Sequence, residues 1–228
     1  MAVFAIADLH LSLGTDKPMD VFNGWNNYVE RLEKKWRAIV KNTDTVVIAG
    51  DISWAMKLEE TENDFKFLNS LPGKKILLKG NHDYWWVTKK KIDEFFKIKE
   101  LDTMQILFNS AVRADEIAVC GSRGWFYDAG ETDIKVINRE AGRLERSIEA
   151  AEQLGGEPVA FLHYPPVYGD FECNEIMDVL IKHKIKRCYY GHIHGSGAGK
   201  KAITGEYKGI KFTLVSCDYT EFCPVLIR

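Results

Sequence analysis

Five short apolar runs in this chain each lead into polar residues of the kinds that bind metals and substrates. A run of this length, rich in β-branched and aromatic residues and bounded by turn signals, is typical of a buried β-strand. The runs cover residues 3–7, 45–49, 75–78, 159–162 and 188–190. In α/β sheets, binding sites form outside the carboxyl ends of the strands. The sequence therefore predicts that polar residues far apart in the chain converge at one site.

The remaining segments predict a mixed α/β architecture. Apolar residues recur at helical spacing over residues 25–40, 58–70, 86–96, 134–154 and 175–183. Strands that alternate with helices favour parallel β-α units, and the short turn at Lys208-Gly209 favours antiparallel pairing among the closing strands. Those closing strands are predicted over residues 202–207, 210–216 and 225–227. Residues 105–109 and 117–120 are predicted to be adjacent strands, followed by a loop over residues 121–132 that holds Arg123, Trp125 and Tyr127. Because no repeat or linker interrupts the pattern, we expect one domain over residues 1–228.

Composition excludes several classes of protein. The chain has 31 Lys and Arg residues against 33 Asp and Glu residues, which gives no electrostatic footprint for duplex DNA or an anionic membrane. Its five cysteines form no C-x-x-C pair and are odd in number, as in a protein with reduced thiols. No signal peptide and no membrane-spanning apolar stretch is predicted. We therefore expect a cytoplasmic protein, and the sequence leaves its oligomeric state open.

The polar residues at the strand ends form a set suited to metal binding. They are Asp8 and His10, Asp51, Asn81 and His82, His163, and His192 and His194. A His-x-His pair alone is weak evidence, since such pairs also occur in ordinary loops. Here, however, five of the six histidines lie at strand ends. Oxygen and imidazole donors without thiolate suit divalent Mn, Fe, Zn or Co. Seven donors exceed the needs of one tetrahedral ion, whereas two ions that share a carboxylate use them all, as in hydrolases of phosphate esters.

The order of these motifs resembles that of the calcineurin-like metallophosphoesterase family. Asp-x-His, Gly-Asp, Gly-Asn-His-Asp, a single His after a strand and Gly-His-x-His follow one another between positions 8 and 194. The resemblance implies a four-layer α/β/β/α sandwich with two mixed sheets and a dinuclear centre between their strand ends. It further implies ligand sets, with Asp51 bridging the two metals. Asp8, His10 and His194 would hold one metal, and Asn81, His163 and His192 the other.

The resemblance also implies a mechanism. A hydroxide that bridges two divalent metals attacks phosphorus in line, while His82 stabilises charge on the phosphoryl oxygens or donates a proton to the leaving group. Many members carry a second carboxylate three residues after the bridging aspartate, which orients the catalytic histidine. This chain has Trp54 at that position. The departure leaves the orientation of His82 open and disfavours a serine/threonine protein phosphatase.

Several aromatic and basic residues close to the motifs are candidates for binding the substrate. Trp54, Trp85 and Tyr164 pack in the core under one interpretation and form a wall for the organic part of a substrate under the other. Arg123 is a candidate phosphate contact. Asp83 is expected to orient its loop through backbone hydrogen bonds. We predict a hydrolase of small phosphate esters, either a phosphatase or a phosphodiesterase. A nuclease of the same family and a non-catalytic metal-binding scaffold are the alternatives.

Overall fold

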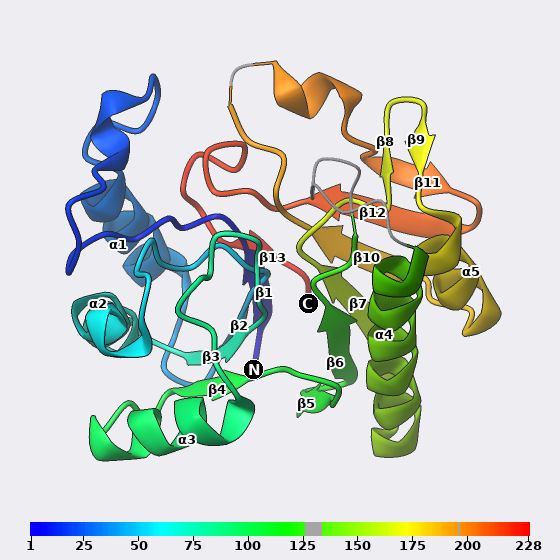
Figure 1. Ribbon diagram of the computed structural model, residues 1–228, viewed down its shortest axis with the longest axis horizontal. Coiled ribbons are helices and arrows are strands. Elements are labelled where there is room, and N and C mark those ends of the chain that lie inside the picture. The colour runs from blue at the N-terminus through cyan, green and yellow to red at the C-terminus, as the bar shows by residue number, and fades with distance from the viewer. Residues whose placement is uncertain (126–133, 196) are drawn as a thin grey trace.

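The computed structural model describes residues 1–125, 134–195 and 197–228, and it forms two β-sheets packed face to face with helices on both outer sides (Figure 1). Tyr127 and most of the loop predicted over residues 121–132 lie outside the described residues. Within the described ranges, no helix combines the length and the apolar character that a bilayer crossing requires. The four layers confirm the α/β/β/α sandwich with two mixed sheets.

The first sheet has five strands, of which four run parallel. Its order is β13 (Val225–Leu226), β1 (Val3–Ile6), β2 (Thr45–Ile48), β3 (Lys74–Leu77) and β4 (Met104–Ile106). Strand β13 pairs with β1 in the antiparallel direction, with Phe4 opposite Leu226. The strands that carry the first three motifs are therefore neighbours, and their carboxyl ends face the same way.

The second sheet has six strands, and its four inner strands run parallel. Its order is β11 (Gly205–Tyr207), β12 (Ile210–Leu214), β10 (Arg187–Tyr190), β7 (Glu157–Leu162), β6 (Ile117–Ser122) and β5 (Val112–Ala114). The predicted antiparallel pair around Lys208-Gly209 is confirmed as β11 and β12. Strands β8 (Val167–Tyr168) and β9 (Phe171–Glu172) form a separate two-stranded hairpin.

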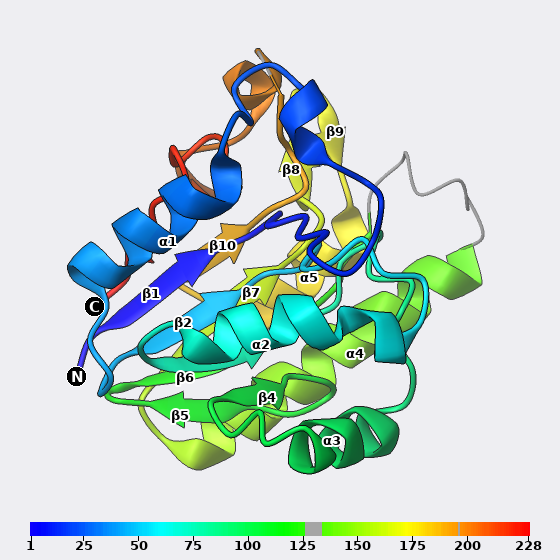
Figure 2. The same ribbon diagram turned by 90° about the vertical axis from the view of Figure 1, so that its left-hand side faces the viewer.

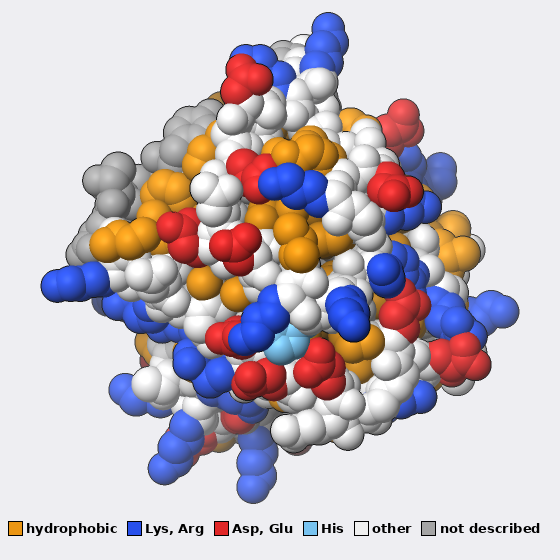
Figure 3. Space-filling model, turned by 90° about the vertical axis from the view of Figure 1, so that its right-hand side faces the viewer, with side chains coloured by type: hydrophobic (Ala, Val, Ile, Leu, Met, Phe, Trp, Pro, Cys, Tyr) orange, Lys and Arg blue, Asp and Glu red, His pale blue; other side chains and the backbone are white. Residues whose placement is uncertain are grey.

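The helices cover the outer faces of the sheets. On the first sheet lie α1 (Tyr28–Ile39), α2 (Glu62–Ser70) and α3 (Lys89–Ile98), and Figure 2 shows α1 and α2 crossing in front of the strands. On the second lie α4 (Ile134–Leu154) and α5 (Asn174–Lys182). Short 3₁₀ turns occupy Met19–Val21, Leu58–Thr61 and Ala198–Lys201. On the face that α4 and α5 cover, Lys and Arg side chains are interspersed with Asp and Glu (Figure 3).

The side chains of each strand alternate between two cores, and this alternation produces the layers. In β1, Phe4 and Ile6 belong to the core under α1, α2 and α3, whereas Val3 and Ala5 belong to the core between the sheets. Successive strand residues point to opposite faces, so a strand that is apolar at every position is buried on both. A third core, around Leu144 and its neighbours, lies between the second sheet and its helices.

Three sequence predictions require correction. Residues 105–109 and 117–120 are not adjacent strands, because β4 ends the first sheet whereas β6 belongs to the second and pairs with β5 and β7. Helix α1 begins at Tyr28 rather than at Trp25. Helix α3 begins at Lys89, where the hydroxyl of Thr88 accepts a hydrogen bond from the backbone N–H of Lys91. Apolar spacing alone does not reveal which sheet a strand joins or where a cap starts a helix.

Candidate metal centre

The predicted site residues lie where the chain leaves β1, β2, β3, β7 and β10, at the carboxyl ends of strands from both sheets. Four of them have left-handed backbone conformations, with φ of 59° at Asp8, 47° at His10, 52° at Asp51 and 69° at His192. Such angles are uncommon for residues other than glycine and occur where the surrounding structure enforces them. In a regular strand, neighbouring side chains would point to opposite faces of the sheet. These bends instead turn neighbouring polar side chains toward one centre.

One group at this centre contains Asp8, His10 and His194. Each offers one donor atom, and these atoms lie within 4.8 Å of one another. The carboxylate of Asp8 is held by the backbone N–H of His192, which donates to its two oxygens at 2.9 and 3.1 Å. The rings of His10 and His194 meet edge to face with centroids 5.1 Å apart. Asp8 and His10 are buried, so the group has the enclosure of a metal site.

The second group contains Asn81, His163 and His192. Oδ1 of Asn81 lies 2.5 Å from Nε2 of His163 and 3.0 Å from Nδ1 of His192. Asp51 lies between the two groups, with Oδ2 at 3.7 Å from Nε2 of His10 and Oδ1 at 3.5 Å from Nε2 of His163. The structure thus brings all seven predicted ligands together, and it places Asp51 where one carboxylate can serve both groups.

The hydrogen bonding of this cluster is incomplete in a way that a cation would resolve. Both ring nitrogens of His10 and Oδ2 of Asp51 are buried without a hydrogen-bond partner among the described residues. Nδ1 of His163 lies 3.1 Å from the carbonyl oxygen of Ala49 and so carries the proton of the neutral ring. The lone pair on Nε2 of His163 then faces the amide oxygen of Asn81. Buried acceptors that converge without donors are costly, and metal coordination satisfies them.

Burial shifts the pKa values of the cluster toward neutral forms. Burial raises the pKa of Asp8 to about 6, and burial together with the charges of Asp83 and Asp8 raises the pKa of Asp51 well above its usual range. Burial and the neighbouring histidines lower the pKa values of His10 and His163. Neutral histidine and ionised carboxylate are the forms that bind metal. A bound cation would therefore lower the raised pKa values of the carboxylates, whereas the lowered pKa values of the histidines already favour the neutral form that binds it.

Asp83 shapes this site without facing the ligands. Its carboxylate accepts hydrogen bonds from the backbone N–H groups of Asp51 at 3.0 Å, Ile52 at 2.9 Å and Gly80 at 2.7 Å. These bonds tie the turn after β2 to the turn after β3. The structure thus gives Asp83 the loop-orienting contacts that the sequence suggested.

We expect Gly80→Ala to disrupt the centre. A Cβ atom at Gly80 would lie 2.1 Å from Oδ1 of Asp51 and 2.2 Å from its backbone nitrogen, and the fixed backbone cannot yield. The variant should lose metal and melt at a lower temperature, as measured by metal analysis and thermal unfolding. Gly142→Ala is the control. It lies within α4, where the nearest atom to a new Cβ is 3.7 Å away, and it should stabilise the helix by about 0.5–1 kcal/mol. Full metal content in Gly80→Ala would contradict this account of the site.

Comparison with known proteins agrees with this geometry. A family model described as calcineurin-like phosphoesterase matches residues 1–196. The chain belongs to the calcineurin-like phosphoesterase family. Membership and the buried Asp and His clusters together support a metal-dependent phosphoesterase. No curated protein sequence matches the chain significantly.

Solved structures with the same fold have distant sequences. One is a phosphopantetheinyl hydrolase from Mycobacterium tuberculosis, with 14% identity and a TM-score of 0.55, covering 99% of this chain and 95% of that one. Another is a protein of unknown function from Aquifex aeolicus, with 15% identity and a TM-score of 0.54, and the same coverage. At this identity the likeness shows the fold alone.

Aromatic rings lie close to His82, the residue predicted to act on the substrate. The ring of Trp54 lies 4.5 Å from that of His82 and stacks on His10 at 4.9 Å. The hydroxyl of Tyr84 lies 3.4 Å from Nδ1 of His82. The backbone N–H of His82 donates to Oδ1 of Asp51 at 2.8 Å. His82 is therefore anchored to Asp51 through its backbone, and its ring contacts both Trp54 and Tyr84.

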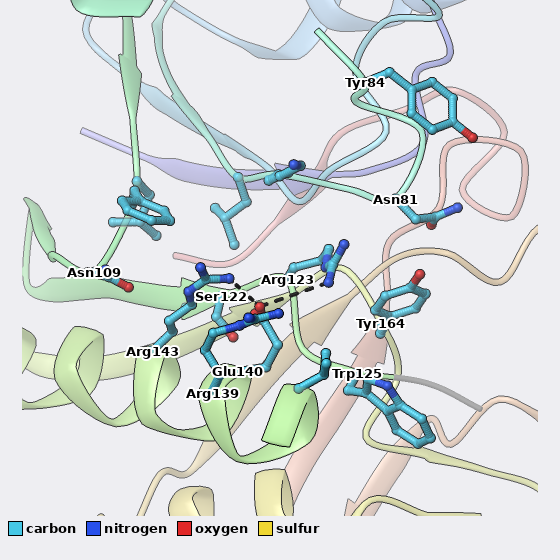
Figure 4. A pocket seen from close by; sticks show the side chains of 16 residues that line it. Asn81, Tyr84, Asn109, Ser122, Arg123, Trp125, Arg139, Glu140, Arg143 and Tyr164 are labelled. Carbon is cyan, nitrogen blue, oxygen red and sulfur yellow. Dashed lines mark hydrogen bonds and ion pairs between the residues drawn. The ribbon is translucent and has the colours of Figure 1, made fainter. Parts of the chain in front are cut away.

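The other predicted substrate residues fall into two places. Trp85 is fully buried, packs edge-on against Phe65 and donates its indole N–H to Asp83, so its contacts are structural. Arg123 and Tyr164 line a cavity of about 580 Å³ that also includes Asn81 (Figure 4). Tyr164 meets the ring of His192 edge to face at 4.7 Å.

Trp25 is a neighbour of the centre that the sequence did not reveal. Its ring lies 5.9 Å from that of His10 and 6.2 Å from that of His194. Its spacing fits the apolar face of the helix predicted over residues 25–40. In the structure Trp25 precedes α1 by three residues, so helical spacing gave no signal for its contacts with the centre.

We expect chelation to lower the melting temperature of the phosphoesterase more at pH 7.5 than at pH 5. Metal at a hundred times its dissociation constant stabilises a folded protein by roughly 2.7 kcal/mol, or about 5–10 °C for this size. Below pH 6, a proton on Asp8 competes with the metal. The raised pKa of Asp8 also means that the stripped protein loses stability as the pH rises from 3.8 through about 6. Both effects come from the same protonation of Asp8, and because of it the loss of melting temperature on chelation grows toward pH 7.5. If chelation lowers the melting temperature equally at pH 5 and at pH 7.5, as measured by thermal unfolding, the prediction is wrong.

Proposed function

We propose that this protein hydrolyses small phosphate esters with two divalent metal ions drawn from Mn, Fe, Zn and Co. Asp51 is the shared ligand. Asp8, His10 and His194 complete one site, and Asn81, His163 and His192 complete the other. The observation that carries the proposal is the position of Asp51, whose two carboxylate oxygens face histidines of opposite groups at 3.7 and 3.5 Å.

The residues of the chain supply orientation and proton transfer. When bound, the metals lower the pKa of water and place positive charge beside the phosphoryl oxygens. His82, whose ring lies 5.7 Å from that of His10, contacts the phosphoryl oxygens or donates a proton to the leaving oxygen. The rings of Trp54 and Tyr84, 4.5 and 6.0 Å from that of His82, orient it in the role that a carboxylate has in many members of the family. No side chain needs to form a covalent intermediate.

Charge favours a small substrate over a nucleic acid. Basic and acidic residues nearly balance, and on the face in Figure 3 the described residues of both signs are interspersed rather than gathered into a basic stripe. Hydrolysis of a nucleic acid is the alternative within the family. A non-catalytic scaffold is the other alternative, and it is disfavoured because none of the seven donors is missing.

The test is turnover of two chromogenic esters by protein stripped of metal and then supplied with Mn, Zn, Co or Mg. Activity toward p-nitrophenyl phosphate or bis(p-nitrophenyl) phosphate that returns with metal supports the proposal, and the preferred ester distinguishes a phosphatase from a phosphodiesterase. Metal binding without turnover of either ester would favour the scaffold. Turnover of single-stranded or duplex DNA at a higher kcat/KM than either ester would favour the nuclease.

A further inference from the structure

The cavity beside Asn81 has a strongly basic lining that the proposed hydrolysis does not require. Four cationic side chains line it: Lys79 after β3, Arg123 after β6, and Arg139 and Arg143 on α4. Glu140 is the one carboxylate among the described lining residues. Figure 4 shows the Arg123 and Arg143 side chains on either side of Glu140, with Asn81 and Tyr164 at the opposite end. The cavity therefore extends from Asn81 of the candidate metal centre to the face of α4.

Glu140 organises the cations without neutralising them. Its side chain is 1% exposed, it forms an ion pair with Arg143, and it lies 3.9 Å from Nη2 of Arg123. One carboxylate balances one of the four charges, so the cavity keeps a net positive charge. Burial lowers the pKa of Lys79, and the charges of Arg123 and Arg143 add to this effect while those of Asp83 and Glu140 oppose it.

Aromatic rings hold two of the guanidinium groups in place. Cζ of Arg123 lies 5.8 Å from the centre of the Tyr164 ring, and Cζ of Arg143 lies 5.5 Å from that of Phe108. The Arg123 and Arg143 side chains are 27% and 31% exposed, so both remain accessible from the cavity. Guanidinium groups fixed in this way bind the oxygens of a phosphate in pairs and lose little entropy on binding.

We propose that this cavity binds a second phosphoryl group of the substrate, so that the preferred substrate carries one phosphoryl group at the metals and another at Arg123, Arg139 and Arg143. The inference rests on the proposed phosphoesterase function and narrows its substrate class. Leu78, Leu107 and Trp125 add apolar walls beside the cations, which suit an organic linker between the two groups.

The test compares two chromogenic diesters that differ by one phosphate. These are the p-nitrophenyl ester of thymidine 5′-phosphate and the same ester with an added 3′-phosphate. Charged hydrogen bonds contribute roughly 1.5–3 kcal/mol each, so we expect kcat/KM to be about 10–100-fold higher for the ester with the second phosphate. In Arg139→Gln and in Arg143→Gln, this ratio should fall toward one.

Arg146→Gln is the matched control. Arg146 is an exposed arginine of the same helix that does not line the cavity, so the variant removes the same charge and should keep the wild-type ratio. Equal kcat/KM for the two esters in the wild-type protein would overturn the inference, as would a preference that persists in both cavity variants. Failure of all esters, including bis(p-nitrophenyl) phosphate, would overturn the proposed function instead.

Discussion

Asp51→Asn is expected to lose metal and turnover together. Its two oxygens face histidines of the two groups, and the amide nitrogen of asparagine cannot coordinate a metal in place of the oxygen it replaces. The metals supply several kcal/mol of transition-state stabilisation, so activity should fall by about a thousandfold or more. Metal analysis of the purified variant and turnover of the chromogenic esters measure the two losses separately.

The control for this substitution is Asp93→Asn. Asp93 lies on α3, half exposed, and pairs with Lys89, so the same change of chemistry there should leave metal content and turnover unaltered. An Asp51→Asn protein that keeps both metals at full stoichiometry would show that Asp51 is not shared. Thermal unfolding of the variant in chelator, compared with stripped wild-type protein, separates loss of metal from loss of the fold.

His82→Ala is expected to keep its metal and lose turnover. The side chain is outside the seven-donor set, while its backbone N–H, which holds Asp51, remains in the variant. General acid catalysis contributes about 10²–10⁴-fold, so we expect a decrease in kcat of that size with an alkyl leaving group. With p-nitrophenolate, which leaves without a proton, the decrease should be smaller. The comparison of the two leaving groups measures proton donation itself.

His183→Ala is the matched control for His82→Ala. His183 follows α5 and its ring contacts Glu152 at 2.9 Å, away from the metal centre. The control should keep metal and turnover. Full activity of His82→Ala with both leaving groups would show that the assigned role is wrong. Tyr84→Phe tests the positioning of the ring, since it removes the hydroxyl beside Nδ1 and should shift the pH profile of kcat without loss of metal.

Much of the fold was predictable because its elements are locally encoded. The predicted helix over residues 134–154 matches α4 at both ends, since its apolar residues recur at helical spacing over six turns. Each of the five predicted strands that precede a motif is present within a few residues. The single-domain prediction over residues 1–228 stays a prediction.

By itself, the sequence determined the chemical identity of the centre. Oxygen and imidazole donors follow each of the five predicted buried strands. These features are local, because a strand end, a bend and a donor occupy a few consecutive residues.

Only the tertiary structure decided what surrounds that centre. The assignment of β4 and β6 to different sheets, the contact of Trp25 with His10, and the basic cavity all depend on packing between distant segments. Lys79, Arg123 and Arg143 come from three separate segments and meet in the cavity. Within its own segment, each of them resembles an ordinary charged residue of a solvated surface. The physical reason is that side-chain spacing encodes which face of an element is buried, while the partner of that face is fixed by the packing of the two sheets and their helices.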